Sequence, residues 1–315
     1  MFLGIDTSNY TTSLAICDAN GVIVEEQKQI LSVRSGERGL RQSEAVFQHV
    51  KNLPDLMEKL QTDPKTLQAI GVTTTPRPVE NSYMPVFRAG EGMARSLAKM
   101  LNLPLVRFSH QENHIRAALY GCALDPEKVQ FPIIATHFSG GTSELLLVHR
   151  SETGYDCQIV GQTLDLNAGQ LVDRIGVAMG LSFPAGKALE QMALTAGGKA
   201  APISSCVEDC DFHFSGQENQ ALALLKQGVP EGEVALGLLR SIAKTLEKAV
   251  RCAAKTYGVH TVLFSGGVMA NGIIKDVLSH RLAKGFHLYF TKPAYATDQA
   301  AGVALLTRDQ FTCRL

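Results

Sequence analysis

Each half of this chain opens in the same way, with an apolar strand, a tight turn of small polar residues and a second strand. In the first half we expect these strands at Phe2–Asp6 and Thr11–Ile16. In the second half we expect them at 133–138 and 144–148. Two antiparallel strands joined by a short turn form a hairpin. The pattern therefore predicts two units that share an architecture without sharing a sequence, and 315 residues allow each unit its own core.

Strands and helices alternate after each hairpin, which predicts an α/β fold. We expect strands at 22–25, 69–73, 105–108, 261–264 and 288–290, and helices at about 43–60, 86–101, 110–121, 168–179, 186–195, 234–257 and 297–306. The longest helix carries Leu238, Ile242 and Leu246 on one face, and Gly258 follows it as a stop signal.

Charge and composition limit the partners that this chain can have. Its 30 basic residues equal its 30 acidic residues, so it has no net attraction to nucleic acid. A polynucleotide would need a helper subunit or a local stripe such as Arg34, Arg38, Arg41 and Lys51, although such a run is more often solvated surface. No apolar run approaches 18 residues and no secretory leader is evident, so we expect no membrane contact and a cytoplasmic location.

Cysteine usage indicates a reducing compartment. Seven scattered cysteines, an odd number, are expected to be free thiols and not a disulfide framework. Cys206 and Cys210 with nearby His213 leave a metal or redox site open as a weaker alternative, because the spacing is loose and the segment is expected to be a loop.

The segment Ser109-His110-Gln111-Glu112-Asn113-His114 predicts the start of a helix that carries two histidines on one face. Ser109 and Glu112 have the spacing of a capping box. His110 and His114 are four residues apart, so both rings can reach one metal ion, and the helix N-terminus favours their neutral form. The order H-Q-E-N-H is not the H-E-x-x-H of zinc proteases. The alternative is a pair of ordinary surface histidines.

Three turns of small residues follow apolar strands, at 6–9, 139–142 and 265–268. Glycines in such turns let backbone N–H groups approach an anion closely. Any one of them is more often an ordinary turn. One in each hairpin and one before a C-terminal helix are the arrangement of the actin-like ATPase fold, in which the hairpin turns straddle phosphates and the third loop holds the nucleoside. The combination favours a nucleotide.

At these motifs the chain resembles the TsaD-type tRNA N6-adenosine threonylcarbamoyltransferases, a family of the actin-like superfamily formerly described as O-sialoglycoprotein endopeptidases. The resemblance covers nearly the whole chain, which looks like a diverged paralog. The segments that carry it are LGIDTSNYTTSLAICD, SHQENH, HFSGGTSELLLV, TLDLNAGQLVDRIGVAMGLSFPAGKALEQMA, DFHFSGQEN, FSGGVMANGII and TKPAYATDQAAGVAL. It implies a two-lobed fold, with residues 1–125 and the helix at about 297–315 in one lobe and residues 126–296 in the other.

The resemblance implies one divalent metal ion, iron or zinc, bound by His110, His114 and Asp298. His137 matches a position where some members have a tyrosine ligand, and it is implied as a further ligand. The alternative for His137 is a hydrogen-bonded core residue of a strand. The alternative for Asp298 is an acid in the first turn of a helix that follows Thr297.

The resemblance also implies a site for an adenine nucleotide or an acyl-adenylate. Two hairpin turns would contact phosphate, other positions would lie near the ribose, and a late loop would border the adenine. The residues concerned are Asn9, Ser139, Gly140, Gly141, Thr142, Asp165, Asp173, Gly186, Gly266, Gly267 and Asn271.

Three positions depart from the family pattern in the nucleotide and substrate region. Leu166 stands in place of a second carboxylate, and Thr142 stands where the family has His or Asn. Glu218 replaces an expected Lys, so a like charge would face an anionic ligand if the side chain stays there. These changes leave His110, His114 and Asp298 intact.

The resemblance implies metal-dependent transfer of a threonylcarbamoyl group from threonylcarbamoyl-AMP to N6 of adenosine 37 in tRNA. It implies tRNA and a small-molecule adenylate as partners, helper subunits of a tRNA-modification complex, and possible dimerisation with a paralogous actin-fold subunit. The alternatives are a related small-molecule carbamoyltransferase, an actin-fold phosphotransferase, and a non-catalytic nucleotide-binding scaffold.

Overall fold

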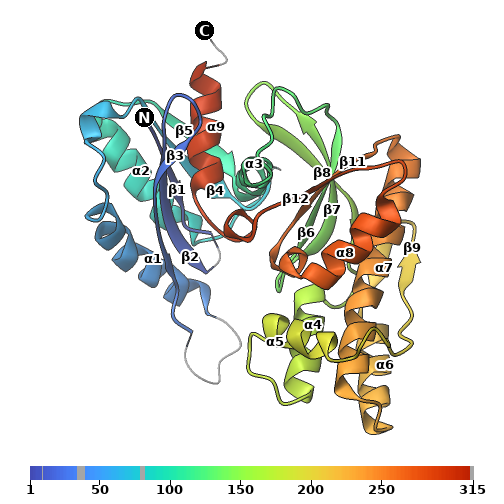
Figure 1. Cartoon of the computed structure of the whole chain (residues 1–315). Coiled ribbons are helices and arrows are strands. Elements are labelled where there is room, and N and C mark those ends of the chain that lie inside the picture. The colour runs from blue at the N-terminus through green and yellow to red at the C-terminus, as the bar shows by residue number, and fades with distance from the viewer. Residues whose placement is uncertain (9, 34–39, 79–81, 313–315) are drawn as a thin grey trace. The chain divides into compact units, whose positions relative to one another are not determined.

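The computed structural model describes residues 1–8, 10–33, 40–78 and 82–312. They form two compact units, which Figure 1 shows with their elements labelled. The first unit comprises residues 1–126, 150–157 and 297–315, and the second comprises residues 127–149 and 158–296. Asn9, Arg34 and Arg38 of the sequence predictions lie outside the described residues. No helix among the described residues is long and apolar enough to cross a membrane.

The first unit is built on a five-stranded sheet whose strand order is β3-β2-β1-β4-β5. Its strands are β1 (Phe2–Asp6), β2 (Thr11–Cys17), β3 (Ile23–Ile30), β4 (Ala69–Thr75) and β5 (Leu105–Ser109). The first three form an antiparallel meander, whereas β4 is parallel to β1 and β5 is parallel to β4. The predicted hairpin opening is confirmed.

Helices cover both faces of this sheet (Figure 1). Leu3 and Ile5 of β1 pack with residues of α1 (Gln42–Met57) and α2 (Phe87–Leu101) in one hydrophobic core. On the other face, a Cβ added at Gly4 would lie 2.5 Å from the backbone nitrogen of Ala304 in α9 (Ala301–Thr312). The helix α3 (His110–Gly121) packs against α9. The absence of a side chain at Gly4 is what allows α9 to lie against the sheet.

The second unit repeats the sheet of the first. Its strand order is β12-β11-β6-β7-β8, so the first strand of the hairpin again lies between the second strand and a later parallel strand. The strands are β6 (Ile133–Phe138), β7 (Ser143–Arg150), β8 (Tyr155–Gln162), β11 (Thr261–Ser265) and β12 (His287–Phe290). The last residue of β7 and the first three residues of β8 belong to the segment 150–157, which is grouped with the first unit. This shared order confirms the predicted duplication of architecture.

The helices of the second unit bury one large core around the long helix α7 (Glu231–Tyr257). Its Leu238, Ile242 and Leu246 are fully buried, and Gly258 ends the helix in the left-handed conformation, as predicted. The other helices are α4 (Ala168–Ala178), α5 (Gly186–Leu194), α6 (Ser215–Lys226) and α8 (Gly272–Leu282), with the short 3-10 helices η2 (Gly267–Ala270) and η3 (Pro293–Tyr295). A further 3-10 helix in the first unit is η1 (Pro64–Thr66).

Two expectations about the second unit are wrong. The segment with Cys206 and Cys210 is not a loop but a two-stranded hairpin of β9 (Cys206–Glu208) and β10 (Asp211–His213). Cys210 forms a disulfide with Cys252 of α7, 42 residues away. The expectation of free thiols is therefore wrong for this pair, and Cys210 is not available for the alternative site with Cys206 and His213.

The last helix begins later than expected. The sequence predicted it from Thr297, but α9 begins at Ala301. Asp298 therefore lies in the irregular segment before the helix, and its interpretation as a first-turn acid is wrong. This segment is held in place by contacts with α3, which are described below.

Candidate metal centre and the turns of the second unit

The helix that carries the two histidines begins directly after strand β5. Ser109 caps it: its Oγ accepts a hydrogen bond from the backbone N–H of Glu112 at 3.2 Å. The Glu112 carboxylate in turn accepts from the backbone N–H of Ser109 at 2.7 Å. This reciprocal pair is the predicted capping box, and it fixes the direction in which the helix leaves the sheet.

Parallel strands bring distant residues to the same edge of the first sheet. Because β1, β4 and β5 run in parallel, their carboxyl ends lie side by side. Asp6 ends β1, Thr73 lies near the end of β4, and His110 follows β5. The Thr73 hydroxyl donates to Asp6 Oδ1 at 2.5 Å, and His110 Nδ1 lies 3.5 Å from Asp6 Oδ2.

His110, His114 and Asp298 form one compact group in the first unit. Their candidate ligand atoms all lie within 4.8 Å of one another. The Nε2 atoms of the two histidines are 2.8 Å apart, and each is 3.4 Å from Asp298 Oδ1. Both rings are almost fully buried, whereas the Asp298 side chain is 21% exposed. The structure thus brings together three of the four side chains for which the sequence predicted metal binding.

Asp6 is a completely buried carboxylate at the base of this group. It accepts hydrogen bonds from the Ser8 hydroxyl at 2.6 Å and from the Asn113 amide at 3.3 Å, besides the one from Thr73. Nδ1 of His110 faces Asp6, and Nε2 of the same ring faces Asp298. Asp6 is therefore suited to orient this imidazole. The sequence analysis did not assign Asp6 to this group.

Asn113 joins three segments that are far apart in the sequence. It lies on α3 between the two histidines and is 1% exposed. Its amide nitrogen donates to the Gln299 carbonyl at 2.6 Å, and its amide oxygen accepts from the Val303 N–H at 3.0 Å. Since the same amide also reaches Asp6, Asn113 ties the segment that contains Asp298 to both α3 and β1.

Burial and nearby carboxylates act in opposite directions on the histidines. Burial by itself lowers the pKa of His110, but the charges of Asp6 and Asp298 outweigh it and raise this pKa to about 10. Burial and the charge of His110 lower the pKa of His114. Burial acts to raise the pKa of Asp298, but hydrogen bonds from both imidazoles hold it well below its usual range. One ring therefore tends to be cationic and the other neutral.

The donor set fits a small divalent cation. A tetrahedral ion with bonds of about 2.0–2.1 Å would hold its ligand atoms about 3.3 Å apart, close to the two 3.4 Å separations from Asp298. The two Nε2 atoms, 2.8 Å apart, would have to move apart by about 0.5 Å when an ion binds. Two imidazoles and one carboxylate suit zinc or iron, and three protein ligands leave a position for an external ligand. His137 belongs to the second unit, whereas the group of three lies in the first. It lies on β6 at the register position of Ser265 on β11, and its role as a ligand stays a prediction.

The predicted phosphate turn of the second unit joins β6 to β7. Ser139 Oγ accepts the N–H groups of Gly141 and Thr142 at 3.2 and 3.0 Å, so the hydroxyl organises the turn itself. The N-terminus of α4 lies against the turn, because Gly169 donates to the Ser139 carbonyl at 3.0 Å. No described heavy atom lies within 4 Å of where a Cβ would stand at Gly140 or Gly141. A helix N-terminus beside an open turn favours an anion.

The third small-residue loop follows β11 and lies against the end of β6. Gly266 has a φ of 101°, and a Cβ there would lie 2.2 Å from the Phe138 carbonyl oxygen, so only glycine fits. Gly267 begins η2 and faces open space. Asn271 caps α8, since its side chain accepts from the Ile274 N–H at 3.0 Å. The structure thus places this loop beside the strand that leads into the Ser139 turn.

Two predicted ribose-side carboxylates have structural partners within the second unit. Asp165 accepts from the N–H of Phe214 at 2.8 Å and from the Ser215 hydroxyl at 2.5 Å. Partial burial acts to raise the pKa of Asp165, but these hydrogen bonds hold it well below its usual range. Asp173 accepts from the N–H of Ala185, which caps the helix that Gly186 begins, and burial raises the pKa of Asp173.

The three departures from the family pattern occupy different environments. Glu218 lies in the first turn of α6, where acids are favoured, and forms an ion pair with Arg174 at 3.3 Å. Its charge is therefore compensated within the unit. Leu166 is buried in the hydrophobic core, where a carboxylate would be costly, and Thr142 completes the Ser139 turn.

Two duplicated sheets, each opened by a hairpin and covered by helices, define an α/β protein of the actin-like fold. The activator of 2-hydroxyisocaproyl-CoA dehydratase from Clostridium difficile has a similar structure, with a TM-score of 0.56 and 13% identity over 99% of this chain and 96% of that one. The family is more specific. Residues 23–305 match the profile of the tRNA N6-adenosine threonylcarbamoyltransferases, and the chain belongs to this family of transferases.

Curated relatives bear the same description. A tRNA N6-adenosine threonylcarbamoyltransferase of Phocaeicola vulgatus is 28% identical over 97% of this chain and 92% of its own length. One of Thermus thermophilus is 29% identical over 96% of this chain and 90% of its own length. Each relative is thus matched over nearly its full length.

Proposed function

We propose that this chain transfers a threonylcarbamoyl group from threonylcarbamoyl-AMP to N6 of adenosine 37 in tRNA, with the help of one divalent metal ion. The observation that carries the proposal is the group of His110, His114 and Asp298 in a chain of this family. In the transfer, a bond forms between N6 and the acyl carbon, the bond from that carbon to the phosphate oxygen breaks, AMP leaves, and N6 loses one proton.

In the first unit, His110, His114 and Asp298 would hold the metal. A bound ion would supply Lewis-acid polarisation of an acyl oxygen. Asp6 lies 3.5 Å from His110 Nδ1 and would orient that ring toward the metal, and Asn113 holds the segment of Asp298 through the Gln299 carbonyl. An aromatic amine is a poor nucleophile, so fixed positions of the groups around the acyl carbon are expected to provide much of the rate.

In the second unit, the Ser139–Thr142 turn and the N-terminus of α4 would bind the phosphate of the adenylate. Backbone N–H groups at such a position stabilise the charge that grows on the leaving phosphate. Gly266 and Gly267 shape the loop beside β6, where we place the adenine end of the nucleotide. Asp165 and Asp173 act mainly by fixing α6 and α5.

The acceptor and helper proteins belong to the same proposal. A chain with equal numbers of acidic and basic residues needs either a local basic surface or partner subunits to bind tRNA. We propose that helper subunits, among them a paralogous actin-fold protein, take part, and that the reaction occurs in the cytoplasm. Of the predicted basic stripe, Arg41 and Lys51 are described and are exposed.

The test is a transfer assay with purified protein, threonylcarbamoyl-AMP and unmodified tRNA, with and without helper subunits. We expect modified adenosine with the wild-type chain and loss of at least about 100-fold in rate with His110→Ala, because one of three metal ligands is removed. His280→Ala is the matched control, since His280 is an exposed histidine on α8. Metal content and thermal unfolding of each variant are measured in parallel.

Two outcomes would contradict the proposal. If the wild-type chain transfers no acyl group to tRNA under any combination of subunits, the assigned reaction is wrong. If His110→Ala loses its metal but transfers at the wild-type rate, the reaction stands and the role of the metal is wrong.

A further inference from the structure

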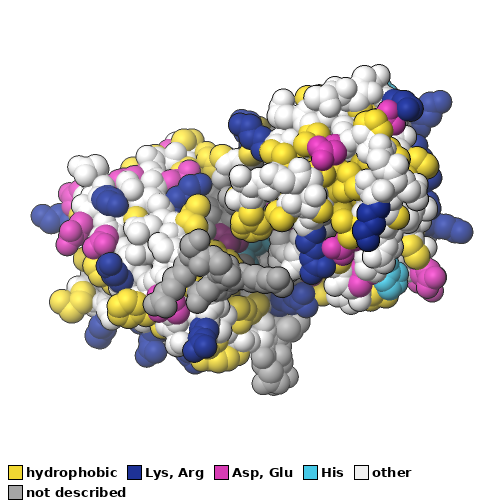
Figure 2. Space-filling model, turned by 90° about the horizontal axis from the view of Figure 1, so that it is seen from below, with side chains coloured by type: hydrophobic (Ala, Val, Ile, Leu, Met, Phe, Trp, Pro, Cys, Tyr) yellow, Lys and Arg dark blue, Asp and Glu magenta, His cyan; other side chains and the backbone are white. Residues whose placement is uncertain are grey.

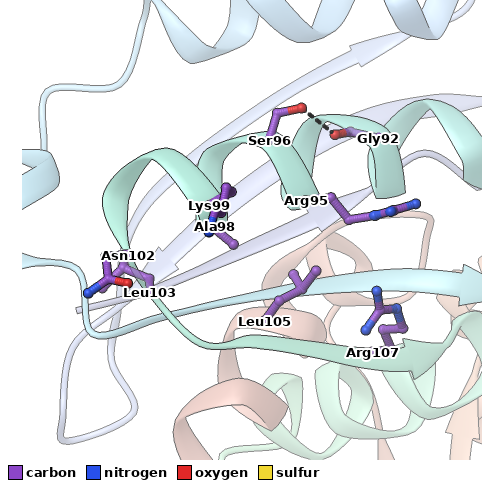
Figure 3. A pocket seen from close by; sticks show the side chains of 9 residues that line it. All are labelled: Gly92, Arg95, Ser96, Ala98, Lys99, Asn102, Leu103, Leu105 and Arg107. Atoms are coloured by element: carbon purple, nitrogen blue, oxygen red, sulfur yellow. Dashed lines mark hydrogen bonds between the residues drawn. The ribbon is translucent and has the colours of Figure 1, made fainter.

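Because the chain has no net charge, only a local excess of basic or acidic side chains indicates a binding surface. Basic and acidic side chains are interspersed over the face that Figure 2 shows, as expected from 30 residues of each kind. A hollow in the first unit differs from this average. It has a volume of about 830 Å³ and lies between helix α2 and the edge strand β5 (Figure 3).

Basic side chains line this hollow from both elements. Arg95 and Lys99 come from α2, and Arg107 comes from β5. Figure 3 shows Arg95 and Arg107 at one end of the hollow, with Asn102 and Leu103 at the other. Among the described residues that line it, none is acidic. We call these three residues and the hollow between them the basic groove.

Only some of these basic side chains form ion pairs within the protein. Arg107 forms an ion pair with Glu91 at 3.3 Å, and Arg88 shares the same carboxylate at 2.8 Å. Lys99 lies in the last turn of α2, where the helix dipole favours a cation. No ion pair between described residues involves Arg95 or Lys99, which are both exposed. Two cations are therefore free to meet an external anion.

Their spacing suits an extended anion. Arg95 and Lys99 are four residues apart on one helical face, so their side chains start about 6 Å apart. Arg107 adds a third donor from a neighbouring element, which extends the positive surface across the groove. The groove is broad and contains exposed polar groups of Ser96 and Asn102. A chain of phosphates fits such a surface better than a single small anion, which needs a closed pocket.

We infer that the basic groove binds the phosphodiester backbone of the tRNA substrate. This inference rests on the proposed function, since that function supplies the polyanion. Contacts with phosphates position an RNA without reading its sequence, so the groove would add affinity and orientation and not base specificity. It would provide the local basic surface that a chain of zero net charge requires.

The test compares two neutralised pairs of equal design. Arg95→Gln with Lys99→Gln removes the two unpaired cations of the groove, and glutamine keeps the helix propensity. Lys244→Gln with Lys248→Gln is the control, because these are also exposed residues four apart on a helix, but on α7 of the second unit. The affinity of each protein for unmodified tRNA is measured over a range of salt concentrations, together with KM for tRNA and kcat.

Each phosphate contact contributes about 0.7–0.9 to the slope of log affinity against log salt concentration. We therefore expect the groove pair to reduce this slope by about 1.5 and to weaken binding at least about tenfold near 0.1 M salt. KM for tRNA should rise while kcat at saturating tRNA is unchanged, because the groove does not touch the reacting atoms. The control pair should change none of these quantities.

Equal slopes for the groove pair and the wild type would overturn the inference, and would leave an acidic protein partner as the occupant to be examined. An equal reduction of the salt-dependence slope in the groove pair and the control pair would also overturn the inference. The effect would then reflect the overall charge of the protein and not the groove. Failure of the proposed function is seen separately, as absence of transfer by the wild type. In that case, the measured affinity of each variant for tRNA still tests whether the basic groove binds RNA.

Discussion

The side chain of Asn113 holds together residues from three parts of the chain. It bonds to the Gln299 carbonyl, to the Val303 N–H and to Asp6, and it lies one residue before His114. A Cβ added at Gly302 would lie 2.0 Å from the Asn113 carbonyl oxygen, so backbone and side chain are both tightly packed. The position of Asp298 relative to the histidines thus depends on a residue that is not itself a candidate ligand.

This dependence predicts the effect of Asn113→Ala. We expect the affinity for Co²⁺ or Zn²⁺ to fall about 10–100-fold, as is usual when a group that orients a metal ligand is lost. The measurement is the visible spectrum of the protein during titration with Co²⁺. Asn52→Ala is the control, because Asn52 is also a buried amide of the first unit and bonds to Thr12. Equal affinities for the two variants would show that Asn113 only stabilises the fold.

The protonation of His110 predicts how metal binding depends on pH. The two carboxylates near His110 raise its pKa to about 10, so this ring holds a proton at neutral pH when no metal is bound. A metal requires the neutral imidazole, and its binding therefore releases about one proton. Affinity should rise about tenfold per pH unit between about pH 6.5 and 8.5. Calorimetry in buffers of different ionisation enthalpy measures the proton release, and pH-independent affinity would contradict the prediction.

At the scale of the element, helix α9 depends on the glycines beneath it. A side chain at Gly4 would meet backbone atoms of Ala300 and Ala304, which cannot rotate away. We expect Gly4→Ala to lower the free energy of unfolding by about 1–3 kcal/mol, the usual cost of overpacking. In Gly92→Ala, a Cβ on α2 has no described heavy atom within 4 Å, so this control should be neutral or more stable by up to about 1 kcal/mol. Urea denaturation compares the two variants.

Elements with a strong local signal were predictable from the sequence. The capping box at Ser109, the long helix that ends at Gly258 and the two hairpins are set by residues close together in the chain. The start of α9 was not predictable, because contacts of Gln299 and Val303 with Asn113 hold the preceding residues outside the helix. Strand β8 was not predicted either. Its residues form a strand only because they pair with β7 at the edge of the assembled sheet.

The candidate site shows the same division. The spacing of His110 and His114 follows from one helical turn, so the sequence placed both on one face. Their closeness to Asp298 came from the family resemblance and not from spacing, since 184 residues separate it from His114. Asp6 was missed, although the parallel order of β1, β4 and β5 would have indicated it: residues at the carboxyl ends of parallel strands meet at one edge.

At the scale of the whole molecule, the disulfide acts within one of the two units. Cys210 and Cys252 both belong to the second unit and are 42 positions apart in the sequence. Chain-entropy arguments give about 4 kcal/mol for a loop of this length, although the origin of such stabilisation depends on the model used. We expect Cys210→Ser with Cys252→Ser to lower the stability of the second unit by an amount of this order.

Hydrogen exchange distinguishes the two units in this experiment. Amide protection should fall in α7 and in the β9–β10 hairpin, whereas the sheet of the first unit should keep its protection. Cys17→Ser, which alters a buried free cysteine of the first unit, is the control. Uniform loss of protection in both units would show that they unfold together.

The order in which the polypeptide is synthesised has a consequence for how the proposed metal ion would be bound. The ribosome delivers both imidazoles early, on α3, but Asp298 emerges only after the entire second unit has been synthesised. A nascent chain would therefore present only the two histidines as metal ligands. The face of the first sheet against which α9 packs would still be uncovered. Under the proposed function, the complete His-His-Asp group would bind its metal ion only late in biogenesis, after the whole chain has been synthesised.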